Sequence, residues 1–177
     1  MSENSEKSKK RKIIIIRAAA TAITLAYLMW IFSNSLATAA ESGAASGKVR
    51  AAVQKCVDFF FGAGKITVSG HFIRKAAHFS EFALLGFLSY FTYFSYFFPK
   101  NKAVPICAVS AAATTLVCGA ADECIQIFVD GRGPSVLDAM IDFSGGICGV
   151  FVALAVFFLI KKAKNRSKKA QNTPENT

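Results

Sequence analysis

Ionisable and amide side chains gather near the ends of three apolar segments of this chain, and the stretches between them carry almost no charge. The nine residues are Lys75, His78, Glu81, Asp122, Glu123, Gln126, Arg132, Asp138 and Asp142. A charged group at the centre of a bilayer costs about 2.5–3.5 kcal/mol on insertion scales, and less near the interface. Charges kept at segment ends therefore indicate a built polar site, and we take all nine as candidate binding residues.

Four of these residues have types suited to acid–base catalysis. His78 and Glu81 lie three residues apart on one helical stripe, and Asp122 and Glu123 could supply a second carboxylate. The sequence shows no recognised arrangement for a nucleophile, so the four remain catalytic candidates only. No metal ion or cofactor is expected, because His71 is the only other histidine and lies in a different setting. The five cysteines form no C-x-x-C pair and indicate neither zinc nor disulfides.

Helical spacing says which of these groups can meet. Gln126 lies four residues after Asp122 and three after Glu123, so it can join either acid. Asp138 and Asp142 are stacked one turn apart with like charge. Close carboxylates repel, so one of the two is expected to hold a proton or to seek a cation such as Lys75 or Arg132.

Purely structural readings of the same residues stay open. Ser135 and Asp138 match a capping box, which would explain Asp138 without a site. Lys75 could be an interface anchor or the partner of Glu81 in a structural ion pair. His78 could be a hydrogen-bonded packing residue.

The composition indicates a small integral membrane protein with one domain. Of the 177 residues, 53% are hydrophobic, and the mean hydropathy of +0.40 is too high for an ordinary soluble domain. The net charge is +10, and 12 of the 21 Lys and Arg residues lie in the first 17 or last 17 positions. The positive-inside rule accounts for these basic ends, so no nucleic-acid partner is expected.

The apolar pattern predicts an all-α, integral membrane four-helix bundle. The predicted spans are residues 13–32, 76–98, 103–128 and 136–160, with disordered basic cytoplasmic tails at 1–12 and 161–177 and a tight turn at 99–102. An even number of spans puts both termini in the cytoplasm. The first extracellular loop is expected to carry a short amphipathic helix from Val49 to Phe60, ended by Gly62 and Gly64.

This topology brings the polar residues to the outer leaflet. At a rise of 1.5 Å per residue, Glu81 and Asp142 lie roughly 9 Å below the outer ends of their helices, and Asp122 lies near the outer interface. The three groups are therefore expected to share one pocket. An alternative for the first span is a cleaved signal peptide, because Ala37-Thr38-Ala39 matches an A-x-A site, although the apolar run is long for one.

Several linked motifs resemble the VanZ-like family. Residues 74–86 resemble its K-x-x-H-x-x-E-Y/F-x-x-L-G signature, residues 122–128 its D-E-x-x-Q-x-F motif, residues 131–138 its G-R…D element, and residues 145–149 its closing glycines. One departure is Asp142, where the family often has Asn. The resemblance implies a bacterial plasma-membrane protein, and the family's namesake is associated with low-level resistance to teicoplanin.

Three functions follow as hypotheses. The first is an envelope protein that binds or shields membrane lipids or lipid-linked envelope precursors, with the cations meeting phosphate or carboxylate. The second is a membrane enzyme using His and carboxylate acid–base chemistry on a lipid-linked substrate. The third is a proton-coupled transporter, which four spans would form only as an oligomer.

Overall fold

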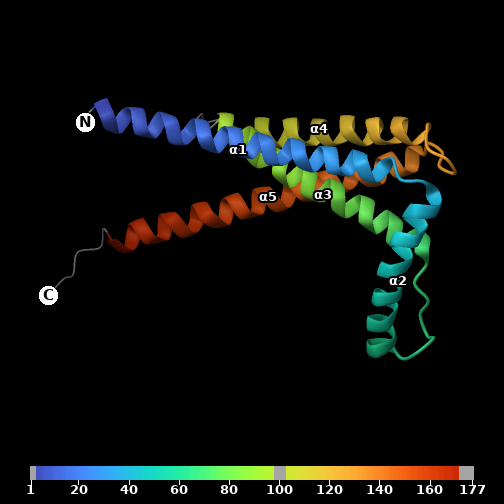
Figure 1. Cartoon of the computed structure of the whole chain (residues 1–177). Helices are drawn as coiled ribbons and strands as arrows, with labels where there is room; N and C mark the ends of the chain where they lie inside the picture. The colour runs from blue at the N-terminus through green and yellow to red at the C-terminus, as the bar shows by residue number, and fades with distance from the viewer. Residues whose placement is uncertain (1–2, 98–102, 172–177) are drawn as a thin grey trace.

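The computed structural model describes residues 3–97 and 103–171. This part of the chain is all-helical and contains five helices. They are α1 (Glu3–Ser35), α2 (Ala39–Phe61), α3 (Gly70–Phe97), α4 (Ala103–Gln126) and α5 (Val136–Gln171). Helices α1, α3, α4 and α5 pack lengthwise, while α2 turns away at the end opposite to both termini (Figure 1). The expected turn at 99–102 lies outside the described residues.

Three of the described helices are long and apolar enough to cross a membrane. These segments are Asn4–Ser35, Ala103–Gln126 and Val136–Ser167. The predicted span at 76–98 is not among them, because α3 alternates its phenylalanines with serine and tyrosine and carries Lys75 and Glu81. Helix α3 is instead the centre of the structure, and it contacts each of the other four helices.

Both polar tails are more ordered than the sequence predicted. Disorder was expected at 1–12 and 161–177, yet α1 begins at Glu3 and α5 continues to Gln171. Lys, Arg and Glu are good helix formers, and a helix already nucleated by an apolar segment extends through them at little cost. An exposed ion pair of 3.2 Å between Glu6 and Lys10, one turn apart, accompanies this extension.

Two helices begin earlier than predicted, each because of a hydroxyl cap. Helix α3 starts at Gly70 rather than Ala76, since the Ser69 side chain accepts from the backbone N–H of Phe72. Helix α2 is a long element rather than a short one, because Thr38 and Glu41 form a capping box at its start. Hydrogen bonds from the backbone and the hydroxyl of Thr38 lower the pKa of the Glu41 carboxyl below its ordinary value.

The end of α2 follows the sequence prediction. Gly62 has a φ of +95°, a conformation that side chains rarely tolerate, and its N–H donates to the Asp58 carbonyl. Helix α4, by contrast, ends at Gln126 instead of residue 128. The start of α5 at Val136 agrees with the predicted one.

Glycines bring the backbones of α3 and α5 into direct contact. A methyl group built on Gly149 would overlap the carbonyl oxygen of Ala83, and one built on Gly145 would overlap that of Phe79. On the α3 side, Gly86 faces the carbonyl of Gly146 in the same way. Small residues allow this close approach in membrane helices, where packing replaces the hydrophobic driving force.

Hydroxyl groups and one arginine join α1 to α3. The Thr24 and Thr92 hydroxyls lie 2.8 Å apart, and the Thr21 and Tyr96 hydroxyls lie 3.0 Å apart. Arg17 donates to the Ser95 carbonyl at 3.0 Å, near the end of α3 where carbonyls lack helical partners. These contacts hold the middle of α1 against the C-terminal end of α3.

The glycine contact gives a stability prediction. Gly149→Ala should lower the thermal stability of the purified protein, because the added methyl group meets the Ala83 carbonyl and overpacking of this kind costs about 1–3 kcal/mol. The measurement is thermal unfolding in detergent, followed by monodispersity on size exclusion.

The matched control is Gly47→Ala in α2, where no atom lies within 4 Å of the new methyl group. A helix-interior alanine should leave stability unchanged or raise it slightly. Equal midpoints for the two variants would contradict the glycine contact.

Candidate functional site

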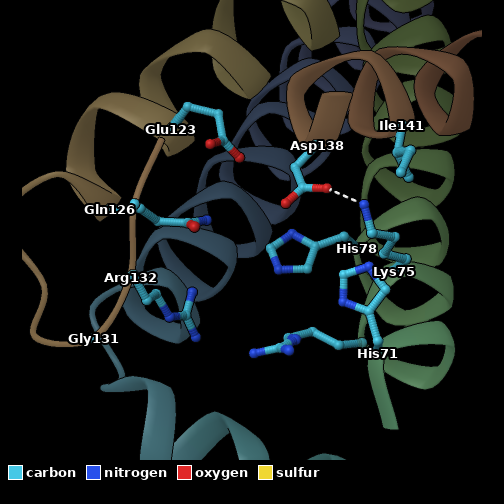
Figure 2. Close-up of a pocket in the computed structure, with 11 residues that line it drawn as sticks. His71, Lys75, His78, Glu123, Gln126, Gly131, Arg132, Asp138 and Ile141 are labelled. Carbon is cyan, nitrogen blue, oxygen red and sulfur yellow. Dashed lines mark hydrogen bonds and ion pairs between the residues drawn. The ribbon is translucent and has the colours of Figure 1, made fainter. Parts of the chain in front are cut away.

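The nine candidate residues come from three helices and one loop at the α2 end of the bundle. Helix α3 supplies Lys75, His78 and Glu81, and α5 supplies Asp138 and Asp142. The rest come from α4 and from the loop at 127–135. Figure 2 shows the α3 side chains facing those of α4 and the loop across a cavity.

Lys75 pairs with Asp138 rather than with Glu81. The Lys75 Nζ atom lies 2.6 Å from Asp138 Oδ1, and both side chains are partly exposed (Figure 2). The like-charge argument expected one of Asp138 and Asp142 to hold a proton or to seek a cation, and Asp138 has Lys75 as its cation. This ion pair ties the start of α5 to α3 at the rim of the cavity.

Glu123, rather than Asp138, accepts one of the two hydrogen bonds of the expected capping box. The Ser135 hydroxyl accepts from the Asp138 backbone N–H at 3.3 Å, as the capping-box pattern predicted. The Ser135 backbone N–H, however, donates to Glu123 Oε2 at 2.6 Å and not to Asp138. Asp138 therefore has its carboxylate available for Lys75, and the purely capping interpretation of this residue is wrong.

Three groups meet behind the cavity, deep among the helices. His78 Nδ1 lies 3.5 Å from Asp142 Oδ1 and 3.9 Å from Asp122 Oδ2. Both aspartates have 0% of their surface exposed. One donor atom from each of the three residues lies within 4.8 Å of the others. We call His78, Asp122 and Asp142 the buried triad.

The two aspartates of the buried triad differ in their hydrogen bonding. Asp122 accepts from the Ser35 hydroxyl through one oxygen and from Gln126 Nε2 at 2.8 Å through the other. Neither oxygen of Asp142 has a hydrogen-bond partner within the described residues, and the same holds for His78 Nδ1. Buried acceptors of this kind are rare in native proteins, and His78 Nδ1, 3.5 Å from Asp142 Oδ1, is the one polar group that faces this carboxylate closely in the described residues.

Glu81 lies on the same helix but outside the buried triad. Its Oε1 atom accepts from Asn34 Nδ2 at 3.3 Å, and its backbone carbonyl accepts from the Tyr27 hydroxyl at 3.3 Å. Glu81 therefore connects α3 to α1 instead of meeting Asp122 and Asp142 directly. Glu81 also lines a cavity together with His78.

Two cavities adjoin the buried triad. The first, of about 180 Å³, lies between α3, α5 and the loop, and we call it the polar cavity. Its charged and titratable lining residues are His71, Arg74, Lys75, His78, Glu123, Arg132 and Asp138. The Nε atom of Arg132 is buried there without a hydrogen-bond partner in the described part of the chain.

The second cavity, of about 670 Å³, lies mainly between α2 and α3, and we call it the α2–α3 cavity. Its walls include Val49, Val53 and Ile73 together with several alanines. Three residues, Arg74, His78 and Arg132, line both cavities. A polar space and a larger, mostly apolar space therefore meet at these side chains.

Sequence reasoning missed the part of α1 in this site. Ser35 and Asn34 bond to Asp122 and Glu81, although they looked like the start of a loop. It also missed Arg74 as a lining residue of the two cavities. The sequence signal for Ser35 and Asn34 was their position directly after the first apolar span. This position puts them at the same end of the bundle as the polar residues of the other spans.

Comparison with known proteins agrees with the resemblance in the motifs. A family model described as VanZ/LLP1 matches residues 14–160, which covers α2, α3, α4 and most of α1 and α5. Searches of the curated proteins and of the solved structures return no match. All nine candidate residues fall inside the matched region. The chain belongs to the VanZ/LLP1 family.

Proposed function

We propose that this chain is a multi-pass protein of the bacterial plasma membrane that binds an anionic envelope amphiphile, and that this binding contributes to glycopeptide tolerance. The amphiphile would be a phospholipid or a lipid-linked cell-wall precursor. Its anionic headgroup would lie in the polar cavity and its acyl chain in the α2–α3 cavity. The observation that carries the proposal is the junction of the two cavities at Arg74, His78 and Arg132.

The charges of the polar cavity favour an anion. Its lining has three permanent cations, Arg74, Lys75 and Arg132, and two carboxylates, Glu123 and Asp138. Asp138 is paired with Lys75, and Glu123 accepts from the Ser135 N–H through Oε2, while its Oε1 has no hydrogen-bond partner among the described residues. The buried Arg132 Nε has none among the described residues, and an arginine fork matches phosphate and carboxylate oxygens.

The α2–α3 cavity suits an acyl chain. Its volume of about 670 Å³ lies in the range of ordinary ligand sites. Helix α2 has no fully buried residue, and it exposes Phe59, Phe60 and Phe61 near its end. A helix with such a face and with Lys48 and Arg50 elsewhere on its surface fits the interfacial region of a bilayer.

The proposed topology has four spans with both termini in the cytoplasm. The three helices with sufficient apolar length support it, and α3 lies among them as the fourth. The two termini lie at one end of the bundle and α2 at the other (Figure 1). The proposal includes a retained α1, because Ser35 and Asn34 complete the polar groups of α3 and α4.

Lipid binding tests the proposed function directly. The purified full chain, titrated with fluorescent phosphatidylglycerol, should bind it more tightly than phosphatidylcholine. Arg132→Gln should weaken phosphatidylglycerol binding roughly tenfold or more, because a hydrogen bond to a charged group contributes about 1.5–3 kcal/mol. Arg50→Gln, on the exposed side of α2, should bind as the parent does. Equal affinity for the two lipids, or an unchanged Arg132→Gln variant, would argue against this site.

A cellular measurement links the site to tolerance. Deleting the chain should increase sensitivity to teicoplanin, a lipidated glycopeptide, more than to a glycopeptide without an acyl chain. Complementation with Arg50→Gln should restore the parental inhibitory concentration, and Arg132→Gln should not. Full restoration by Arg132→Gln would separate tolerance from the polar cavity.

Cysteine labelling tests the topology. Cys56 lies exposed on α2, and Ser167→Cys would add an exposed thiol on the polar end of α5. A membrane-impermeant maleimide applied to intact cells should label Cys56, while the residue-167 thiol should react only after permeabilisation. Mass spectrometry of the peptides separates these sites from the exposed Cys124 and Cys148 and from the buried Cys107 and Cys118. The reverse pattern would invert the proposed orientation.

A second candidate function is a membrane enzyme acting on a lipid-linked substrate. The contact of 3.5 Å between His78 and Asp142 favours it, because a carboxylate beside an imidazole is a common acid–base arrangement. His78 also lines both cavities, so a substrate in either could reach it. Lipid profiles of deletion and overexpression strains distinguish the two functions, since an unchanged profile excludes turnover.

A further inference from the structure

We propose that the buried triad of His78, Asp122 and Asp142 binds a first-row divalent metal ion such as Zn²⁺ or Mn²⁺. The three side chains come from α3, α4 and α5, and one donor atom from each lies within 4.8 Å of the others. The sequence argument against a metal rested on the lack of a second nearby histidine. Two aspartates from other helices supply the remaining donors instead. This proposal does not depend on amphiphile binding.

The distances fit metal coordination with little adjustment. Ligand atoms bound at 2.0–2.2 Å from Zn²⁺ lie about 3.3–3.6 Å apart at the tetrahedral angle. His78 Nδ1 is 3.5 Å from Asp142 Oδ1 and 3.9 Å from Asp122 Oδ2. The two aspartate oxygens lie within 4.8 Å of each other, so the carboxylates would close on the ion as it binds.

The hydrogen bonding of Asp142 points independently to a missing partner. Its Oδ2 atom is buried without a donor from the described residues, its Oδ1 atom faces only His78 Nδ1 at 3.5 Å, and the residue has 0% exposure. His78 Nδ1, the atom that faces it, is likewise unpartnered. A metal ion would satisfy all three atoms at once, because it accepts electron pairs from imidazole nitrogen and carboxylate oxygen alike.

Charge balance favours a divalent ion over a proton on the imidazole. Asp122 and Asp142 together carry two formal negative charges among packed helices. A protonated His78 would offset one of them, whereas a divalent ion offsets both. Lys75, on the same helix as His78, is already engaged with Asp138.

Neighbouring groups orient the ligands as in known metal sites. The Ser35 hydroxyl and Gln126 Nε2 donate to Asp122, which holds the plane of this carboxylate. An imidazole with two carboxylates suits Zn²⁺ or Mn²⁺ better than Mg²⁺, which prefers oxygen ligands and keeps its waters. Three protein ligands leave a coordination position for water or another oxygen donor.

Metal titration of the purified full chain tests the proposal. A purification tag without histidine is required, and EDTA treatment comes first. Calorimetric titration with Zn²⁺, with metal content measured by plasma mass spectrometry, should give one ion per chain. Asp142→Asn and His78→Gln should bind at least about tenfold more weakly. The matched control Asp130→Asn removes an exposed carboxylate of the loop at 127–135 and should bind as the parent does.

A second measurement decides the question even where these variants fold poorly. The chain has two histidines, so His78 is the only imidazole in a His71→Gln background. Pulsed electron paramagnetic resonance of that chain with Mn²⁺ should show nitrogen coupling from the His78 ring. Absence of nitrogen coupling, absence of stoichiometric Zn²⁺ in the parent, or parental affinity in a folded Asp142→Asn variant would overturn the metal site.

Discussion

The arrangement of polar groups in this protein depends on the contact between the backbones of α3 and α5. Glycines at 86, 145 and 149 remove the side chains that would separate the two helices. Gly146 on the same stretch of α5 packs against Thr115, so α4 is drawn to the same place. His78 and Asp142 lie on the two apposed helices just beyond these glycines, which is why a 3.5 Å contact forms between them. Without the glycines, the acids of α4 and α5 would be held apart from the imidazole of α3.

Local chemistry explains which parts of the fold the sequence could predict. Helix identity followed from apolar length, and the start of α5 followed from the turn residues and Ser135 before it. The start of α3 was missed because His71, Arg74 and Lys75 broke the apolar pattern, although Ser69 is a sufficient cap. The helical extensions into the basic tails were not predicted. A helix propagates cooperatively from an apolar segment, so the tail residues need no periodic apolar pattern of their own.

The partners of the polar residues were harder to predict than the residues themselves. Spacing along one helix limits which side chains share a face, but it does not say which neighbouring helix lies opposite. The sequence left a Lys75–Glu81 pair open, yet Lys75 pairs with Asp138, while Glu123 holds the Ser135 backbone N–H. The sequence argument on metals had the same limit, since it counted histidines in sequence and not carboxylates in space.

The arginines of the polar cavity and the two aspartates of the buried triad attract one another. Arg74 and Arg132 line the polar cavity beside His78, and Asp122 and Asp142 lie behind it. In a medium of low dielectric, the two acids lower the potential felt by an anion in the cavity and weaken its binding. A divalent ion on the buried triad would cancel that opposing field and leave the arginines unopposed. Linkage requires the reverse as well, so an anion in the polar cavity would tighten metal binding by the same factor. The two proposed ligands, each argued from separate contacts, would therefore cooperate through charge alone.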